Sequence, residues 1–266
     1  GKTVVALHWA AERARRSAAD GHGLSVLFTT FVKTLPPVFE NLYNRMPDCV
    51  PGAVEFVHLH KLAYQVCRAA GDNPWVNMSA VTEASKAAFK QVVRAGTPLG
   101  DDGIDRSYLE AEVRAVIKGR GIRSLEEYLK VLRTGRGTRF DPSRRRQAWD
   151  YMKEWDAGMA QRDTLDFADT ITRAVEHAQG FTGPWYRAAV IDEAQDLTLM
   201  GLQLVRALVN GKRDDDRDDG LLIVGDGAQR IYPGAFTLRQ AGVEVRGRTT
   251  VLRLNYRNTA EILAAA

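Results

Sequence analysis

The stretch Val190-Ile191-Asp192-Glu193-Ala194-Gln195-Asp196 decides the fold of this chain. Two alanines precede it, so an apolar run of strand-forming residues ends directly on two carboxylates. A short run of this kind predicts a buried strand followed by a polar loop. The same letters also fit a strand that leads into a helix with an acidic first turn, where carboxylates are favourable in any protein.

Other apolar runs predict further strands, separated by segments with helical patterns. The predicted strands cover residues 24–28, 54–57, 188–191, 221–224 and 249–254, and the predicted helices cover 4–16, a segment that starts at Pro36-Pro37, and 60–68. Strands separated by helices indicate a parallel α/β sheet. The last three runs each end on a polar cluster, and parallel sheets bind ligands at the carboxyl ends of their strands.

The segment from residue 71 to 161 has a different character. It is polar and helical in pattern, with turn residues near 97–103 and 135–142. Ser124 is placed to cap a helix, with Glu127 at the capping-box position. This segment is therefore predicted to be a helical insertion rather than part of the sheet.

The composition is that of an ordinary globular protein. Among 266 residues, 45% are apolar and 26% are charged. No run approaches the roughly 18 apolar residues of a membrane span, and no signal peptide is visible, so we expect no membrane partner. Cys49 and Cys67 form no CxxC pair, which argues against a zinc site or a disulfide framework and favours the cytoplasm.

The net charge of +4 is compatible with a polyanionic partner without requiring one. The charges are unevenly distributed along the chain. One stretch is rich in arginine and another in aspartate, and the residues are Arg133, Arg136, Arg139, Arg144, Arg145 and Arg146, and Asp214, Asp215, Asp216, Asp218 and Asp219. The aspartate stretch is typical of a solvated loop, whereas the arginine stretch is equally suited to a solvated face and to nucleic-acid phosphates.

The first three residues, Gly1-Lys2-Thr3, match the end of the phosphate-binding loop G-x-x-x-x-G-K-[ST]. In that loop, backbone N–H groups surround the phosphates, the lysine reaches the β/γ oxygens and the hydroxyl holds Mg²⁺. A tripeptide alone carries little weight. An apolar strand that ends on Asp192-Glu193 adds a Mg²⁺ ligand and a group that positions water, which are the other needs of phosphoryl transfer.

Four motifs in a fixed order strengthen this interpretation. Gly-Lys-Thr is followed by Asp-Glu-Ala-Gln-Asp, then by Gly-Asp-x-x-Gln-x-Ile-Tyr from residue 225, and then by Leu-x-x-Asn-Tyr-Arg from residue 252. They resemble motifs I, II, III and IV of UvrD/Rep/PcrA-like superfamily 1 DNA helicases. Residues 27–31, 57–62 and 165–169 are similar to motif Ia, motif Ib and the Asp-Phe-x-Asp motif of the same family.

The resemblance implies an α/β fold, a RecA-like P-loop NTPase sheet flanked by helices, with a helical inserted subdomain. Residues 1–70 and 162–266 would form the ATP-binding subdomain 1A, and residues 71–161 the inserted subdomain 1B. The family hydrolyses ATP with Mg²⁺, walks 3′ to 5′ along single-stranded DNA and unwinds duplexes at single-strand/double-strand junctions.

Site residues follow from the matching positions. Gly1, Lys2 and Thr3 would bind the phosphates, and Thr3 would share the Mg²⁺ with Asp192. Glu193 would be the catalytic base. The resemblance adds three residues: Gln229 as the γ-phosphate sensor, Tyr256 on adenine and Arg257 as an arginine finger.

DNA contacts are implied at motifs Ia, Ib and III. The positions are Phe28, Thr29, Thr30, His60 and Tyr232. Binding of a single strand without sequence preference needs aromatic faces for bases and polar or basic groups for phosphates. Phe28 is as well suited to the core of a strand, whereas Tyr232 lies in a polar loop where a core role is less natural.

Some family features differ here. Motif III runs Tyr232-Pro233-Gly234-Ala235-Phe236, so its second aromatic is displaced and Phe236 receives no stacking role. The rest of the phosphate loop and motifs V and VI lie outside the 266 residues, so we expect a second RecA-like domain to complete the ATP site. The chain alone is predicted to bind nucleotide weakly and not to unwind DNA.

Two other functions compete with a DNA helicase. One is a UvrD-like motor module of an antiphage or RNA-polymerase-remodelling protein, whose output is a protein partner. The other is a small-molecule P-loop kinase, which motifs III and IV argue against. Unwinding of a 3′-tailed duplex would discriminate the first from a helicase.

Overall fold

A computed structural model describes residues 1–21, 23–133, 137–182, 185–209, 220–225, 236–243 and 247–251. Within them, four parallel strands form one sheet in the order β2-β1-β3-β4. The strands are β1 Val26–Thr30, β2 Val54–His58, β3 Ala188–Asp192 and β4 Leu221–Ile223. Four predicted strands are thus confirmed. In the fifth, residues 249–251 form no regular element and residues 252–254 lie outside the described part.

Alternation along the central strands sends side chains into two separate cores. Val26 and Phe28 of β1 face one core, whereas Leu27 faces the other. In β3, Val190 faces the first core and Ile191 the second. All five residues of both strands are buried, as expected of a parallel sheet covered on both faces.

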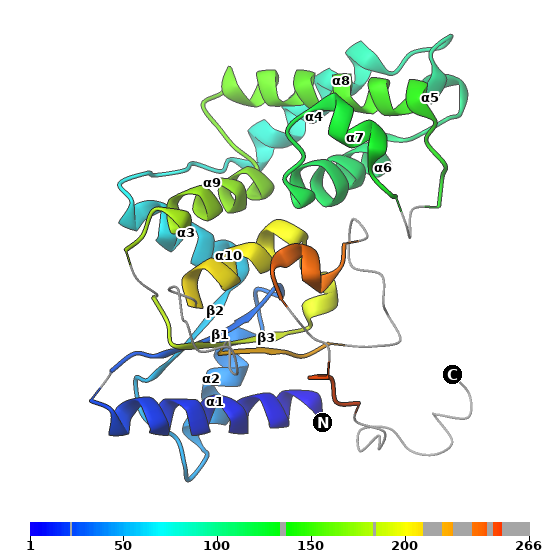
Figure 1. Ribbon diagram of the computed structural model, residues 1–266. Helices are drawn as coiled ribbons and strands as arrows, with labels where there is room; N and C mark the ends of the chain where they lie inside the picture. Colours follow the sequence, from blue (N-terminus) through cyan, green and yellow to red (C-terminus); the bar gives the residue numbers. More distant parts are fainter. Residues whose placement is uncertain are drawn as a thin grey trace.

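Helices cover both faces of the sheet (Figure 1). On one face lie α1 Lys2–Ala19 and α2 Pro36–Asn44. Most of the alanines of α1 are buried in the core on this face. On the other face lie α3 Leu59–Ala69, α9 Phe167–Gln179 and α10 Leu199–Val209. The result is a three-layer α/β unit, and the predicted helices at 4–16, 36 onward and 60–68 are confirmed.

The chain between α3 and α9 forms a helical unit with a core of its own, drawn at the top of Figure 1. Its α-helices are α4 Met78–Val92, α5 Pro98–Asp101, α6 Arg106–Glu112, α7 Leu125–Lys130 and α8 Pro142–Ala160. Trp155 and Tyr151 of α8 are fully buried in that core. The predicted cap is present, since the Glu127 N–H donates to Ser124 Oγ at 3.2 Å, while the Glu127 carboxylate accepts from the Arg123 N–H.

A buried lysine joins the helical unit to the α/β unit. α6 continues into a π-helical turn, Val113–Ile117, and a 3₁₀ turn, Lys118–Arg120. The Lys118 ammonium lies 2.7 Å from Asp156 of α8, and 3.3 and 2.8 Å from Asp166 and Asp169 at the start of α9. Burial would lower the pKa of Lys118, but the three carboxylates together raise it, so the lysine stays charged. None of the helices among the described residues is long and apolar enough to cross a membrane.

Candidate functional site

The first helix and the third strand meet at the carboxyl edge of the sheet. Thr3 lies in the first turn of α1, and its hydroxyl donates to Asp192 Oδ2 at 3.0 Å, although 189 positions separate the two residues. The start of this helix carries N–H groups without partners inside the helix, which favours anions nearby. The structure thus brings the Gly-Lys-Thr and Asp-Glu motifs together.

Asp192 is a carboxylate held out of water. It is 2% exposed at the end of β3. Burial, reinforced by the charge of Glu193, raises the pKa of Asp192, whereas the Thr3 hydrogen bond and the charge of Lys2 lower it. A hydroxyl and a carboxylate in contact are the oxygen ligands that Mg²⁺ prefers, so these two residues fit a magnesium ion beside a phosphate.

Glu193 turns the chain out of β3. Its backbone is left-handed, with φ 52° and ψ 46°, and the 3₁₀ turn Ala194–Asp196 follows it. The Gln195 side-chain amide donates to Glu193 Oε2 at 2.5 Å. Glu193 therefore lies next to Asp192 with a polar partner of its own.

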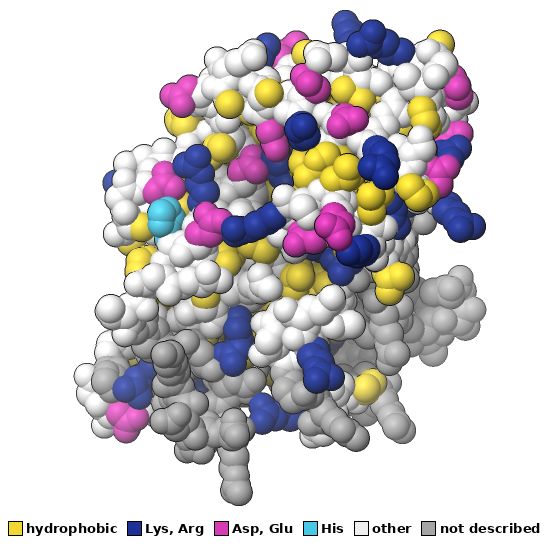
Figure 2. All heavy atoms as spheres, turned by 45° about the horizontal axis from the view of Figure 1, so that its top comes forward, with side chains coloured by type: hydrophobic (Ala, Val, Ile, Leu, Met, Phe, Trp, Pro, Cys, Tyr) yellow, Lys and Arg dark blue, Asp and Glu magenta, His cyan; other side chains and the backbone are white. Residues whose placement is uncertain are grey.

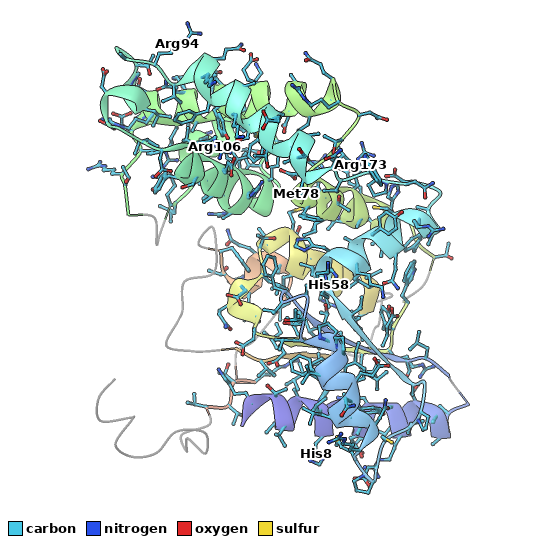
Figure 3. The ribbon with its side chains drawn as sticks, turned by 180° about the vertical axis from the view of Figure 1, so that it is seen from behind. His8, His58, Met78, Arg94, Arg106 and Arg173 are labelled. Carbon is cyan, nitrogen blue, oxygen red and sulfur yellow. The ribbon has the colours of Figure 1, made fainter. Side chains whose placement is uncertain are left out.

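The carboxyl end of β1 connects this corner to a second group of side chains. Thr30, the last residue of β1, is in register with Asp192 on one side and with His58 of β2 on the other. His58 lies where β2 passes into α3, as Figure 3 shows from behind. The two groups therefore share one edge of the sheet.

This second group is an aromatic patch formed by Phe31, His60 and Phe167. The His60 ring lies 5.2 Å from Phe31 and 4.7 Å from Phe167, measured between ring centroids. Phe31 is 38% exposed and Phe167 is 41% exposed. Two solvent-facing rings and the partly buried ring of His60, from the end of β1 and the starts of α3 and α9, are suited to stacking on nucleic-acid bases.

His60 is a neutral member of the aromatic patch. Burial, and then the nearby His58, lower the pKa of His60 to about 4. The positive charges close to His58 come from Lys33 and Lys61, whose side chains are exposed. The aromatic patch thus combines uncharged rings with nearby ammonium groups.

Phe28, Thr29 and Thr30, all predicted to contact DNA, do not reach this surface. Phe28 is 1% exposed and packs between Phe39 and Phe56, with ring centroids 5.2 and 5.3 Å away. Thr29 is fully buried, as is Thr30. The core role considered for Phe28 is therefore the one that the structure shows. Phe31, three residues further on, is the exposed ring in the segment that resembles motif Ia. Its position in a polar segment just after a strand could have indicated from the sequence that it is exposed.

Several predicted residues lie outside the described residues. They are Gln229, Tyr232, Tyr256 and Arg257. Phe167 was noted only as part of the Asp-Phe-x-Asp motif. In the structure, the Asp166 and Asp169 of this motif form a capping box at the start of α9, which places Phe167 at the first position of that helix.

Half of the arginine stretch serves the helical unit itself. Arg133 pairs with the fully buried Glu112, Arg144 with Asp102 and Asp141, and Arg145 donates to three backbone carbonyls. Arg139 and Arg146 are exposed, and Arg136 lies outside the described residues. Figure 2 shows basic and acidic side chains interspersed on this face. The face drawn in Figure 2 is therefore not uniformly basic.

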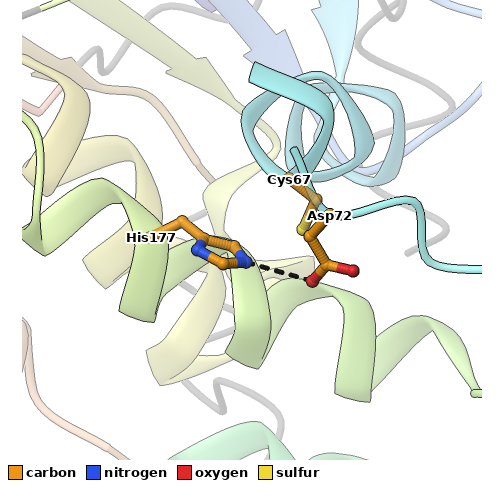
Figure 4. Close-up of side chains that lie close together, drawn as sticks. All are labelled: Cys67, Asp72 and His177. Carbon is orange, nitrogen blue, oxygen red and sulfur yellow. Dashed lines mark hydrogen bonds and ion pairs between the residues drawn. The ribbon is translucent and has the colours of Figure 1, made fainter. Parts of the chain in front are cut away.

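Cys67, Asp72 and His177 form a second cluster of potential metal ligands, between α3 and α9 (Figure 4). His177 Nε2 lies 3.0 Å from Asp72, which also pairs with Arg173 at 3.3 Å. Burial raises the pKa of the Cys67 thiol to about 11, so the sulfur is protonated. An Asp72 already paired with two basic side chains, beside a neutral thiol, is best described as a link between the two helices.

The sheet lies between two layers of helices, and Gly1-Lys2-Thr3 begins α1 next to the Asp-Glu end of β3. This arrangement is that of a RecA-like P-loop fold. The family model of the UvrD/REP helicase N-terminal domain matches residues 55–242, and the chain belongs to this family.

Among curated proteins, the chain is similar to the ATP-dependent DNA helicase UvrD1 of Mycobacterium bovis and of Mycobacterium tuberculosis. Each is 36% identical over 126 residues, which is 42% of this chain and 16% of the relative. The matched segment is thus a small part of those helicases.

Proposed function

We propose that this chain is the N-terminal motor portion of an ATP-dependent DNA helicase that moves 3′ to 5′ on single-stranded DNA. The contact between Thr3 and Asp192 carries the proposal, because it joins a phosphate-loop hydroxyl to a buried carboxylate across 189 positions. The similarity to UvrD1, an ATP-dependent DNA helicase by name, supports the same assignment. Residues 71–161 would act as the inserted subdomain 1B, and a second RecA-like domain would close the ATP site.

The chemistry assigned to the described residues is phosphoryl transfer to water. Lys2 neutralises the β/γ-phosphates, and Thr3 and Asp192 hold Mg²⁺, which supplies further positive charge when it is bound. Glu193 orients the attacking water and accepts its proton. Gln229 and Arg257 act on the γ-phosphate and Tyr256 on adenine, in keeping with the motif resemblance.

Single-stranded DNA would lie along the carboxyl edge of the sheet. The aromatic patch offers faces on which bases stack, and each stack is worth roughly 1–3 kcal/mol. Exposed Lys33 and Lys61 lie at the same edge, where phosphates need positive charge. Tyr232 would be a further base-stacking residue, in keeping with the motif resemblance.

A Glu193→Gln substitution in the intact protein that carries this sequence tests the proposal. The amide keeps the shape of the side chain but cannot accept a proton, so ATP binding should persist while DNA-stimulated hydrolysis falls at least about 100-fold. The wild-type protein should unwind a 3′-tailed duplex and leave a 5′-tailed one paired. Unchanged hydrolysis would remove the base from Glu193, and unwinding of only the 5′-tailed duplex would reverse the direction.

A further inference from the structure

The backbone at Glu193 is unusual for a residue with a side chain. Among the described residues other than glycine, only Asp163 and Glu193 have a positive φ. Such a conformation persists when the surrounding structure holds it, and it is frequent at functional sites. It lets the chain leave β3 after Asp192 and enter the 3₁₀ turn that carries Gln195.

Gln195 holds one of the two carboxylate oxygens of Glu193. The distance from Gln195 Nε2 to Glu193 Oε2 is 2.5 Å. A carboxylate that acts as a general base must present its other oxygen to water in one orientation. A hydrogen bond from a neighbouring amide fixes that orientation, since a base held loosely loses much of its efficiency.

Gly225 determines how much room Gln195 has. A methyl group added at Gly225 would lie 2.9 Å from Gln195 Oε1, which is too close for an ordinary contact. The backbone around this contact is fixed, because the Ala194 N–H donates to the Val224 carbonyl at 3.0 Å and the Val224 N–H to the Ile191 carbonyl at 2.8 Å. The Gln195 amide therefore lies between the Glu193 carboxylate and the Gly225 backbone.

We infer that Gln195 is a positioning residue that orients Glu193, and that position 225 is glycine because a side chain there would push Gln195 off the carboxylate. This inference rests on the proposed function, in which Glu193 is the catalytic base. It assigns to the motif Asp-Glu-Ala-Gln-Asp a third working side chain, and it links that motif to the first residue of Gly-Asp-x-x-Gln.

The first test replaces Gln195 by methionine in the intact protein. Methionine has similar length but donates no hydrogen bond, so kcat of the DNA-stimulated ATPase should fall about tenfold or more while KM for ATP changes less than about twofold. In single-turnover assays, Gln195→Met should cause no further loss in a Glu193→Ala background, because Gln195 acts through that carboxylate.

The second test replaces Gly225 by alanine, which acts on Gln195 from the other side. The clash falls on the end of a flexible side chain, so Gln195 should shift while the melting temperature stays close to that of the wild type. We expect a loss of kcat similar to that of Gln195→Met. Gly23→Ala is the matched control, because an added methyl there meets nothing within 4 Å, and its kcat should be unchanged.

The outcomes separate the inference from the proposed function. If the wild-type protein shows no DNA-stimulated ATPase, the proposed function fails, and the inference fails with it. If the wild type hydrolyses ATP but Gln195→Met and Gly225→Ala retain full kcat, only the inference is overturned. An equal loss from Gln195→Met with and without Glu193 would also overturn it, as would losses that merely follow a fall in melting temperature.

Discussion

His60 shows how burial changes the role that a residue can take at the proposed DNA-binding edge. A histidine near phosphates is easily imagined as a cation, but the pKa of His60 is lowered to about 4 by burial. At neutral pH the ring is uncharged, so its contribution to DNA binding has to come from stacking or from a hydrogen bond. The exposed lysines nearby carry the charge.

This difference is measurable through the salt dependence of single-stranded DNA binding. His60→Ala should weaken binding by about 1 kcal/mol or more without changing the slope of log K against log salt, since no counterion is released at a neutral ring. Lys61→Ala should reduce that slope by about 0.7. Fluorescence anisotropy at several salt concentrations, in the intact protein, checks both. A smaller slope in His60→Ala would mean that the ring is charged.

The pKa of His60 also predicts an acid sensitivity of the fold. Between pH 6.5 and about 4, the histidine at position 60 is protonated in the unfolded chain but not in the folded one. The free energy of unfolding therefore decreases as the pH falls through that window. The loss is at most about 3 kcal/mol, because one pKa unit corresponds to about 1.4 kcal/mol. Urea unfolding at pH 7 and pH 4.5 should show a smaller decrease in His60→Phe, which keeps a ring but cannot titrate. An equal decrease in both proteins would contradict the assignment.

At the scale of elements, the helical unit depends on the ion pair between Arg133 and Glu112, although Arg133 belongs to the arginine-rich stretch of the sequence. Arg133 Nε lies 2.6 Å from Glu112 Oε1, and Tyr128 donates to the same oxygen at 2.8 Å. The side chains of Arg133 and Glu112 are 5% and 0% exposed. An ion pair this deeply buried fixes α6 against α7 and the loop that follows it.

Removing one partner of this pair should therefore unfold the helical unit rather than weaken DNA binding. Arg133→Met leaves the buried Glu112 carboxylate without its cationic partner, and we expect a loss of about 3–5 kcal/mol in stability. Arg123→Met, which breaks an exposed pair with Glu176, should cost less than about 1 kcal/mol. Thermal denaturation, combined with DNA titration of the folded protein, distinguishes a structural role from a DNA contact. If Arg133→Met is as stable as the wild type but binds DNA more weakly, Arg133 contacts DNA instead.

The sheet was predictable from sequence because its strands are short apolar runs with polar endings, and those endings also indicated the site. The destination of side chains was less predictable. Phe28 and Phe31 lie three residues apart, and only the packing of Phe28 against Phe39 and Phe56 separates core from surface. Nor does the letter pattern show that Gln195 contacts Glu193, since that contact requires the left-handed backbone at Glu193.

At the scale of the whole molecule, Lys118 determines how the helical and α/β units hold together. It is 7% exposed and faces carboxylates from α8 and from the start of α9. Burial and the charge of Asp166 raise the pKa of Asp169, so the carboxylates depend on the lysine for compensation.

Lys118→Met should leave three carboxylates facing one another without a cation. We expect a loss of about 3–5 kcal/mol, and limited proteolysis should cut between the two units. Lys130→Met is the control, since its pair with Glu126 is exposed on both sides and should contribute less than about 1 kcal/mol. Wild-type stability in Lys118→Met would show that the apolar contacts between the units suffice.

The pairing of β1 directly with β3 has a consequence for how the chain folds. Val26 lies beside Ala188, so the central pair of the sheet closes over more than half of the chain. Closing so long a loop is costly in entropy, but a segment that has already collapsed on its own core shortens the effective distance between the strands. During synthesis residues 71–161 leave the ribosome before β3 does, and the corner that joins Thr3 to Asp192 can form only after β3 has emerged.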